Sequence, residues 1–91
     1  MANFGDFEWD IEKASSNRRK HGVAFEEAAK AMRDPFAVDF EDLADPSKLV
    51  TLAMSPRDRM LYIVTTQRGD RVRIISARAV TSHERRLYQE Q

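Results

Sequence analysis

The chain has 91 residues and no cysteine, so a small hydrophobic core must supply most of its stability. A chain of this length forms one domain, residues 1–91, since single domains run from about 50 to 250 residues. It buries only about two thirds of its unfolded surface, so its stability margin is thin and a bound partner would raise it. Disulfides and thiolate metal sites are excluded.

Charge divides the chain into an acidic first half and a basic second half. Residues 1–46 carry 6 Lys and Arg against 11 Asp and Glu, and residues 47–91 carry 9 against 4. All but one of the bases in the second half are Arg, which makes bidentate contacts with phosphate. This division either marks a nucleic-acid surface in the second half or is an ordinary fluctuation among solvated side chains.

Two observations exclude other classes of protein. No stretch is long and apolar enough to span a membrane, and the acidic start lacks the pattern of a signal peptide, so we expect a cytoplasmic protein without membrane contact. The two histidines are distant and the carboxylates lack ligand spacing, so we expect neither a metal nor a cofactor.

Apolar periodicity predicts one strand and two helices in the first half. Residues 4–9 alternate aromatic and polar side chains, which is typical of a short strand with one buried face. One helix is expected over residues 11–20, with Asp10 as its N-cap and Gly22 at its C-terminal end. A second helix is expected over residues 25–33, and it ends there because a proline follows closely. The first helix has a poor apolar stripe, so it is either exposed or has a polar role.

The second half predicts a sheet and a last helix. Strands are expected over residues 37–41, 49–54, 60–67 and 71–79, joined by turns as an antiparallel meander. Thr81 and Glu84 have the spacing of a capping box, and a helix to about residue 89 follows. We therefore expect an α+β fold with two N-terminal helices, an antiparallel sheet of three to four strands and a C-terminal helix.

Several segments, taken in order, resemble the BrnT toxins over nearly the whole chain. They are Phe7-Glu8-Trp9-Asp10, Lys13, Asn17, Lys20-His21-Gly22-Val23, Phe25-Glu26-Glu27-Ala28, Arg73-Ile74-Ile75-Ser76-Ala77-Arg78, Glu84-Arg85 and Tyr88. The resemblance implies a toxin of a type II toxin–antitoxin system with a RelE-like fold that cleaves RNA. It also implies neutralisation by a BrnA-like ribbon-helix-helix antitoxin. The two proteins would together repress their own operon, with operator DNA contacted only through the antitoxin.

Cleavage of RNA without metal needs a group that moves protons and several fixed cations around the phosphate. We expect Arg73, Arg78 and Arg59 to hold the phosphate, and His21 or Lys20 to assist proton movement. Arg73 and Arg78 are five positions apart, so a regular strand would point them to opposite faces. Both can serve one site only if a bulge intervenes or if Arg78 has left the sheet, and we expect the second.

Each candidate also has a structural interpretation. His21 could cap the helix end, and Lys20 could lie along the helix surface. Arg73 or Arg78 could belong to a structural ion pair, for instance with Glu84, which as a capping residue is a weak candidate for a general base.

Other side chains are candidates for contacts with RNA. Arg68 lies at the far end of the hairpin strand from Arg59, so only one of the two can reach a given phosphate. Trp9 and Tyr88 could stack on bases, although core packing is the better interpretation of Trp9. Arg59 could be a solvated turn residue, and His83 is expected to be exposed.

Two functions from other classes stay open. The chain could be a non-catalytic binding module that recruits an antitoxin for transcriptional repression, which its neutral charge and acidic first half would suit. It could also occupy the ribosome without cutting RNA, in which case messenger RNA would stay intact during growth arrest.

Overall fold

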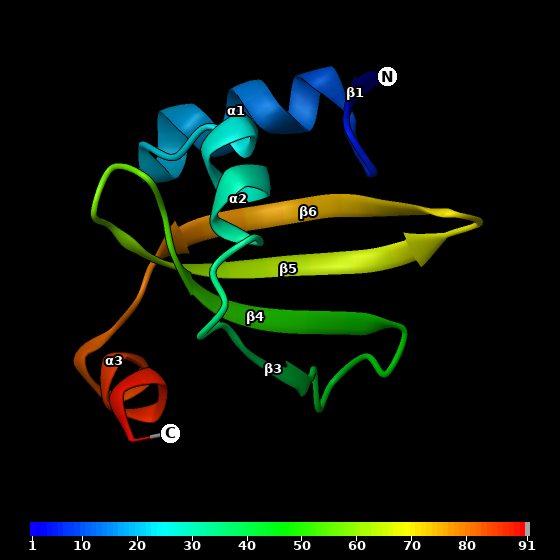
Figure 1. Cartoon of the computed structure of the whole chain (residues 1–91). Coiled ribbons are helices and arrows are strands. Elements are labelled where there is room, and N and C mark those ends of the chain that lie inside the picture. Colours follow the sequence, from blue (N-terminus) through cyan, green and yellow to red (C-terminus); the bar gives the residue numbers. More distant parts are fainter. Residues whose placement is uncertain (91) are drawn as a thin grey trace.

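The computed structural model describes residues 1–90 and has an α+β fold built on one six-stranded sheet (Figure 1). An N-terminal hairpin of β1 (Ala2–Phe4) and β2 (Phe7–Trp9) precedes the helices α1 (Ile11–His21) and α2 (Phe25–Ala31). The chain continues through β3 (Val38–Glu41), β4 (Lys48–Met54), β5 (Met60–Arg68), β6 (Arg71–Ala79) and α3 (Ser82–Gln89).

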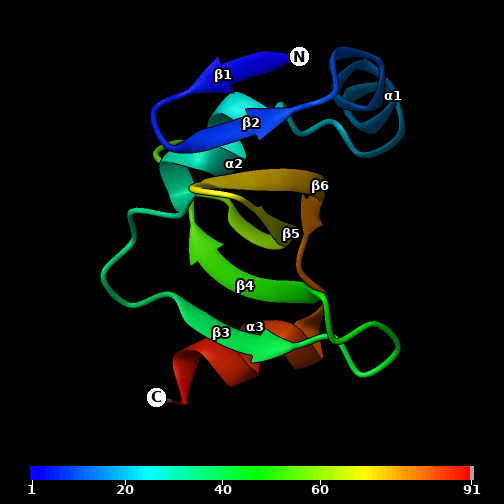
Figure 2. The same ribbon diagram turned by 90° about the vertical axis from the view of Figure 1, so that its right-hand side faces the viewer.

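The strands lie in the order β1-β2-β6-β5-β4-β3 (Figure 2). Four of the five pairings are antiparallel, and β2 pairs with β6 in parallel through Phe7 with Val72 and Glu8 with Arg73. The short hairpin therefore lies beside the last strand of the meander, although more than 60 residues separate them in the sequence. The motif at the start of the chain, in β2, and the motif that contains Arg73, in β6, are therefore neighbours in the sheet.

The expected arrangement of two N-terminal helices and three to four antiparallel strands is wrong, although the α+β class is correct. The chain begins with a hairpin, and the sheet is mixed and has six strands. Residues 4–9 do not form one strand, because Gly5 takes a left-handed φ of 59° and turns the chain between β1 and β2. Strands of three residues are too short for alternation to separate them.

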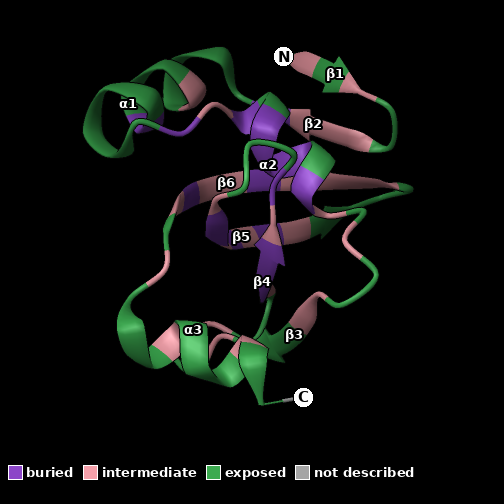
Figure 3. Cartoon of the chain, turned by 60° about the vertical axis from the view of Figure 1, so that its left-hand side comes forward, coloured by how far each residue is buried: buried purple, intermediate pink, exposed green. Residues whose placement is uncertain are grey.

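One face of the sheet, here called the α2 face, carries the main core (Figure 3). Helix α2 packs against β5 and β6 on this face through Phe25, Ala28 and Ala29. Leu61 and Ile63 of β5 are buried there as well. The apolar spacing predicted for the second helix is thus the spacing that fills the core.

The opposite face, here called the α3 face, is covered in part by α3, which packs against β4. Thr81 caps this helix, and both bonds of the predicted capping box with Glu84 are present. No residue of α3, all of which the structure describes, is buried, and Leu87 keeps 40% of its surface exposed. Within residues 1–90, no helix has the length and apolar character needed to cross a membrane.

Candidate functional site

A bulge in β6 decides where the arginines of this strand point. Val64 of β5 pairs with Ser76 and Thr65 pairs with Ile74, so Ile75 is an extra residue without a partner in β5. A bulge of this kind shifts the alternation of side chains by one position. The expectation that Arg78 leaves the sheet is therefore wrong, because Arg78 lies within β6 and pairs with Tyr62.

As a result, Arg73, Ser76 and Arg78 form one row on the α3 face. Their partners on β5 are Thr66, Val64 and Tyr62, which alternate regularly and so point to the same side. The bulge also lets Ile74 and Ala77 both face the core on the α2 face.

Helix α1 lies along the outer edge of β6. The side chain of Asn17 in this helix forms hydrogen bonds with the backbone of that edge. Beyond Arg73, β2 no longer pairs with β6, so this edge would be open. The Asn17 amide nitrogen donates to the carbonyl of Ala77 over 2.9 Å, and the Ala77 N–H donates to the Asn17 oxygen over 3.2 Å. The same amide donates to the Val23 carbonyl, and Asn17 is only 7% exposed. The polar role predicted as one option for α1 is the completion of this edge.

An open groove runs between α1 and this edge of β6. Lys13, Ser16, Asn17, Lys20 and His21 line it from the helix, and Ile75 and Ser76 line it from the bulge. Among the described residues, Lys20 forms no ion pair, so its ammonium is available to an anion. Ser76 joins the groove to the row of Arg73 and Arg78.

His21 is the last residue of α1 and is exposed in this groove. Gly22 follows it with a φ of 71°, and its N–H donates to the carbonyl of Arg18. The predicted C-cap at Gly22 is therefore present, and the backbone N–H of Gly22 forms the capping hydrogen bond.

Arg73 is paired with Glu8 on the neighbouring strand β2. Its Nε lies 2.8 Å and its Nη2 lies 2.6 Å from the same carboxylate oxygen. The parallel register of β2 and β6 places the two residues side by side.

Arg78 is paired with Glu84 of α3. The two terminal nitrogens donate to the two carboxylate oxygens, each over 2.9 Å, and the guanidinium lies 3.9 Å above the centre of the Tyr62 ring. The bond from Arg78 lowers the pKa of Glu84 from its usual range, and that of Arg78 is raised in turn. The ion pair with Glu84 was one of the two interpretations that the sequence left open for this arginine.

Arg59 belongs to a different environment, on the α2 face. Its Nε donates to Glu27 of α2 over 3.0 Å, its Nη2 donates to the other carboxylate oxygen and to the Gly22 carbonyl, and Ser55 donates to Glu27 over 2.7 Å. The bond from Arg59 lowers the pKa of Glu27, which is buried. Arg59 thus ties α1, α2 and the β4–β5 turn together, and the sheet separates it from Arg73 and Arg78.

Glu27 is the residue of this cluster that sequence reasoning missed. Its partner Arg59 lies 32 positions further along the sequence. Residue spacing predicts pairs within one helix or strand, but not a pair between a helix and a turn that are so far apart in the sequence.

Two further predicted residues lie away from the groove. Trp9 is 5% exposed and packs against Phe4 and Phe25, with ring centroids 6.5 and 6.0 Å away, so its faces are covered by protein. Arg68 is exposed at the β5–β6 turn, at the other end of the sheet from His21. His83 is exposed, as predicted, and Tyr88 donates its hydroxyl to Asp34.

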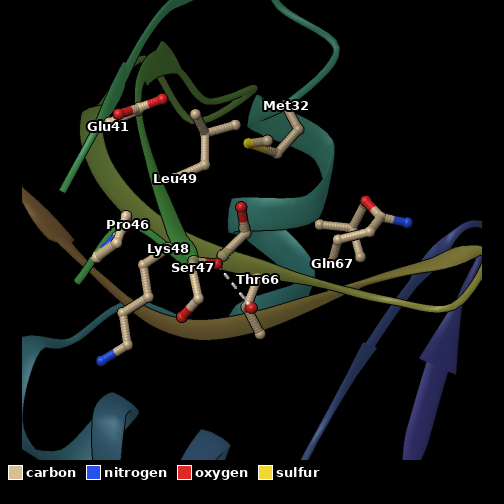
Figure 4. Close-up of a pocket in the computed structure, with 10 residues that line it drawn as sticks. Met32, Glu41, Pro46, Ser47, Lys48, Leu49, Thr66 and Gln67 are labelled. Carbon is tan, nitrogen blue, oxygen red and sulfur yellow. Dashed lines mark hydrogen bonds between the residues drawn. The ribbon is translucent and has the colours of Figure 1, made fainter.

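A second hollow lies between the start of β4 and the end of β5 (Figure 4). Met32, Leu49 and Val72 give it a largely apolar lining, and Thr66 donates to the Ser47 carbonyl at its rim. No predicted site residue lines it. Among residues 1–90, no group of three His, Asp or Glu side chains could hold a metal ion.

Comparison with known proteins gives two findings. Residues 9–84 match the family described as the ribonuclease toxin, BrnT, of type II toxin–antitoxin systems. The crystal structure of the Brucella abortus ribonuclease toxin, BrnT, is similar with a TM-score of 0.69 and 19% identity, covering 84% of this chain and 96% of that chain. That likeness, at such low identity, shows a shared fold alone. No curated protein sequence matches the chain.

Proposed function

The chain belongs to the BrnT family of ribonuclease toxins of type II toxin–antitoxin systems, and on this premise we propose that it is a metal-independent endoribonuclease with its RNA site in the groove between α1 and β6. The observation that carries the proposal is that Lys20 and His21 line one groove with Ser76, next to the row of Arg73 and Arg78. This places an imidazole and several cationic side chains close together, and such groups can move a proton and stabilise the charge that develops when a phosphodiester is cleaved.

We assign these side chains different tasks in one reaction. The 2′-OH of RNA attacks the adjacent phosphorus, the bond from phosphorus to the 5′ oxygen breaks, and the proton of the 2′-OH must be taken up while the leaving oxygen receives one. His21 is the imidazole of the groove and moves a proton. Lys20 stabilises the phosphorane charge.

Arg73 and Arg78 bind phosphates on either side of the cleaved one, because they flank Ser76 on the same face. Arg59 has a structural task in this proposal, since its guanidinium is bonded to Glu27 and Gly22 on the α2 face. Trp9 is left out because its ring is covered, and Arg68 is at most a distant contact with the RNA backbone.

A type II system implies an antitoxin protein as partner. We propose a BrnA-like ribbon-helix-helix antitoxin that neutralises the toxin, with the complex repressing its own operon through DNA contacts of the antitoxin. The acidic first half of the chain, with 11 carboxylates against 6 bases, would complement a basic partner surface.

The direct test is induction of the chain alone in bacteria, with total RNA examined for new ends during growth arrest. Two variants are compared with the wild type: the single variant His21→Ala and the double variant Arg73→Ala, Arg78→Ala. The control is Lys30→Ala, which removes an exposed base on α2 outside the groove. We expect arrest and RNA fragments with the wild type and the control only. Purified protein should cleave RNA in the presence of EDTA, and loss of cleavage in EDTA would refute metal independence.

One observation favours the runner-up function, a non-catalytic module that recruits an antitoxin. Each of the three arginines predicted to hold phosphate is paired with a glutamate, namely Glu27, Glu8 or Glu84. Normal growth and intact RNA after induction of folded wild-type protein would favour this module over the ribonuclease.

A further inference from the structure

The three arginine–glutamate pairs differ in how firmly the carboxylate is held. Glu27 is 6% exposed and accepts bonds from Ser55 and Arg59, so it is fixed inside the fold. Glu8 lies in β2, directly beside Arg73 in the register of the sheet. Glu84, by contrast, belongs to a helix of which no residue is buried.

Helix α3 is held against the sheet by packing on β4, where Leu52 and Val50 are buried on this face, and by polar contacts at two of its own residues. Glu84 and Tyr88 are its two half-buried residues, and they are bonded to Arg78 and Asp34 respectively. Leu87 keeps 40% of its surface exposed, so it covers the sheet only in part. A helix held in this way can move away from Arg78 without opening the main core, which lies on the α2 face.

We propose that Arg78 on the Tyr62 ring is a phosphate subsite for RNA, and that Glu84 occupies it until an RNA phosphate takes the place of the carboxylate. The inference rests on the proposed ribonuclease function and adds how its site is controlled. Two oxygens of a phosphodiester fit the fork of a guanidinium as two carboxylate oxygens do, and both groups carry one negative charge. Tyr62 keeps the guanidinium in place, at 3.9 Å from its ring centre, when the occupant changes.

The position of Arg78 supports an RNA ligand. It lies in one row with Ser76, which lines the basic groove beside Lys20 and His21. A phosphate at Arg78 would therefore belong to a chain that continues into the groove. Glu84 is 15% and Arg78 34% exposed in their side chains, so the pair is accessible from solvent.

Glu84→Gln is the informative change, because glutamine still serves a capping box while it removes the charge that competes with phosphate. Glu90→Gln is the matched control: it removes an equal charge at the end of the same helix, from a residue without an ion pair among those described. The probe is single-stranded RNA with 2′-O-methyl sugars, which cannot be cleaved through a 2′-OH. Circular dichroism checks that each variant is folded.

We expect Glu84→Gln to bind this RNA about threefold to tenfold more tightly than the wild type and Glu90→Gln to differ from it by less than about twofold, the scale of an exposed ion pair. The gain must disappear in the Arg78→Ala background, as a double-mutant cycle requires. Unchanged affinity of Glu84→Gln, or an equal gain without Arg78, overturns the subsite.

Cleavage of unmodified RNA, measured in parallel, separates the two proposals. Cleavage by the wild type together with an unchanged affinity of Glu84→Gln would overturn the subsite and leave the ribonuclease standing. Absence of both binding and cleavage in folded wild type and variants would overturn both.

Discussion

Arg73 and Arg78 point to the same side of β6 although five positions separate them, because Ile75 is bulged out of the pairing with β5. Their partners Thr66 and Tyr62 are four positions apart, which corresponds to about 13 Å along a strand. The two guanidinium groups are also bonded to different partners, Glu8 of β2 and Glu84 of α3, so the structure does not position them on one phosphate. They can contact two different phosphates of one RNA strand.

This geometry predicts independent effects of the two arginines on RNA binding. Arg73→Ala and Arg78→Ala should each weaken binding and should each reduce the slope of log K against log salt by about 0.7, the value for one phosphate contact on a single strand. Since sites more than about 7–10 Å apart act independently, the double variant should lose the sum of the two free energies within about 0.5 kcal/mol. Salt titrations by fluorescence anisotropy measure this.

A non-additive result would place both arginines on one phosphate and contradict the distance argument. The control is the double variant Glu8→Gln, Arg73→Ala. It shows how much of the loss in RNA affinity of Arg73→Ala comes from leaving the Glu8 carboxylate without its partner.

The local features of the fold could be predicted from the sequence, and the long-range ones could not. Asp10 and Gly22 bound the first helix as their capping chemistry predicts, and Thr81 with Glu84 starts the last one. The parallel pairing of β2 with β6 joins segments more than 60 residues apart and leaves no periodic signal. The bulge at Ile75 leaves no signal in the sequence either, since every residue around it fits a regular strand.

The candidate site was predicted in part for the same reason. Lys20 and His21 are neighbours in the sequence, and they do line one groove. The distinction between Arg59 and Arg78 depends on which glutamate lies opposite each, and the distance from Arg59 to Glu27 is 32 positions. The sequence offers Glu84 as a possible partner of Arg78, six positions away, but a pattern of residue types gives no information on a partner as remote in the sequence as Glu27.

Asn17 offers a test of how the edge of β6 is completed. Asn17→Leu should lower the free energy of unfolding by about 1–3 kcal/mol, because the Ala77 N–H and two carbonyls lose their partners in a buried position. Urea denaturation measures the loss. Ser16→Ala, an exposed change in the same groove, should have an effect of less than about 0.5 kcal/mol, and an equal loss in both variants would contradict the role of Asn17.

Glu27 should make the fold sensitive to acid. The bond from Arg59 lowers its pKa below the ordinary 4.5, so the carboxylate contributes stability above that pH and loses it as the pH falls through the lowered pKa. Glu27→Gln should therefore be less stable than the wild type at neutral pH by about 2 kcal/mol, and the difference should shrink in acid. Chemical denaturation at several pH values below 7 gives the comparison.

The neighbouring Glu26 is the natural control for this prediction. It is exposed on the same turn of α2, and Glu26→Gln should change the stability little at any pH. A constant difference between Glu27→Gln and the wild type over the acid range would show that the carboxylate charge is not what stabilises the cluster.

The anchor of α3 at Tyr88 should respond to alkali. The Tyr88 hydroxyl donates to Asp34 over 2.6 Å, and this bond raises the tyrosine pKa from 10.0 to about 12. A raised pKa means that the protonated hydroxyl stabilises the fold fully below pH 10, and that this contribution is lost as the pH rises from 10 towards 12. Tyr88→Phe lacks the hydroxyl, so its disadvantage in unfolding free energy should be largest below pH 10 and should decrease above it. Urea denaturation of both proteins at pH 8 and pH 11 is the measurement, and Tyr62, present in both, cancels from the difference. A disadvantage that stays the same at both pH values would mean that Tyr88 holds α3 by its ring and not by its bond to Asp34.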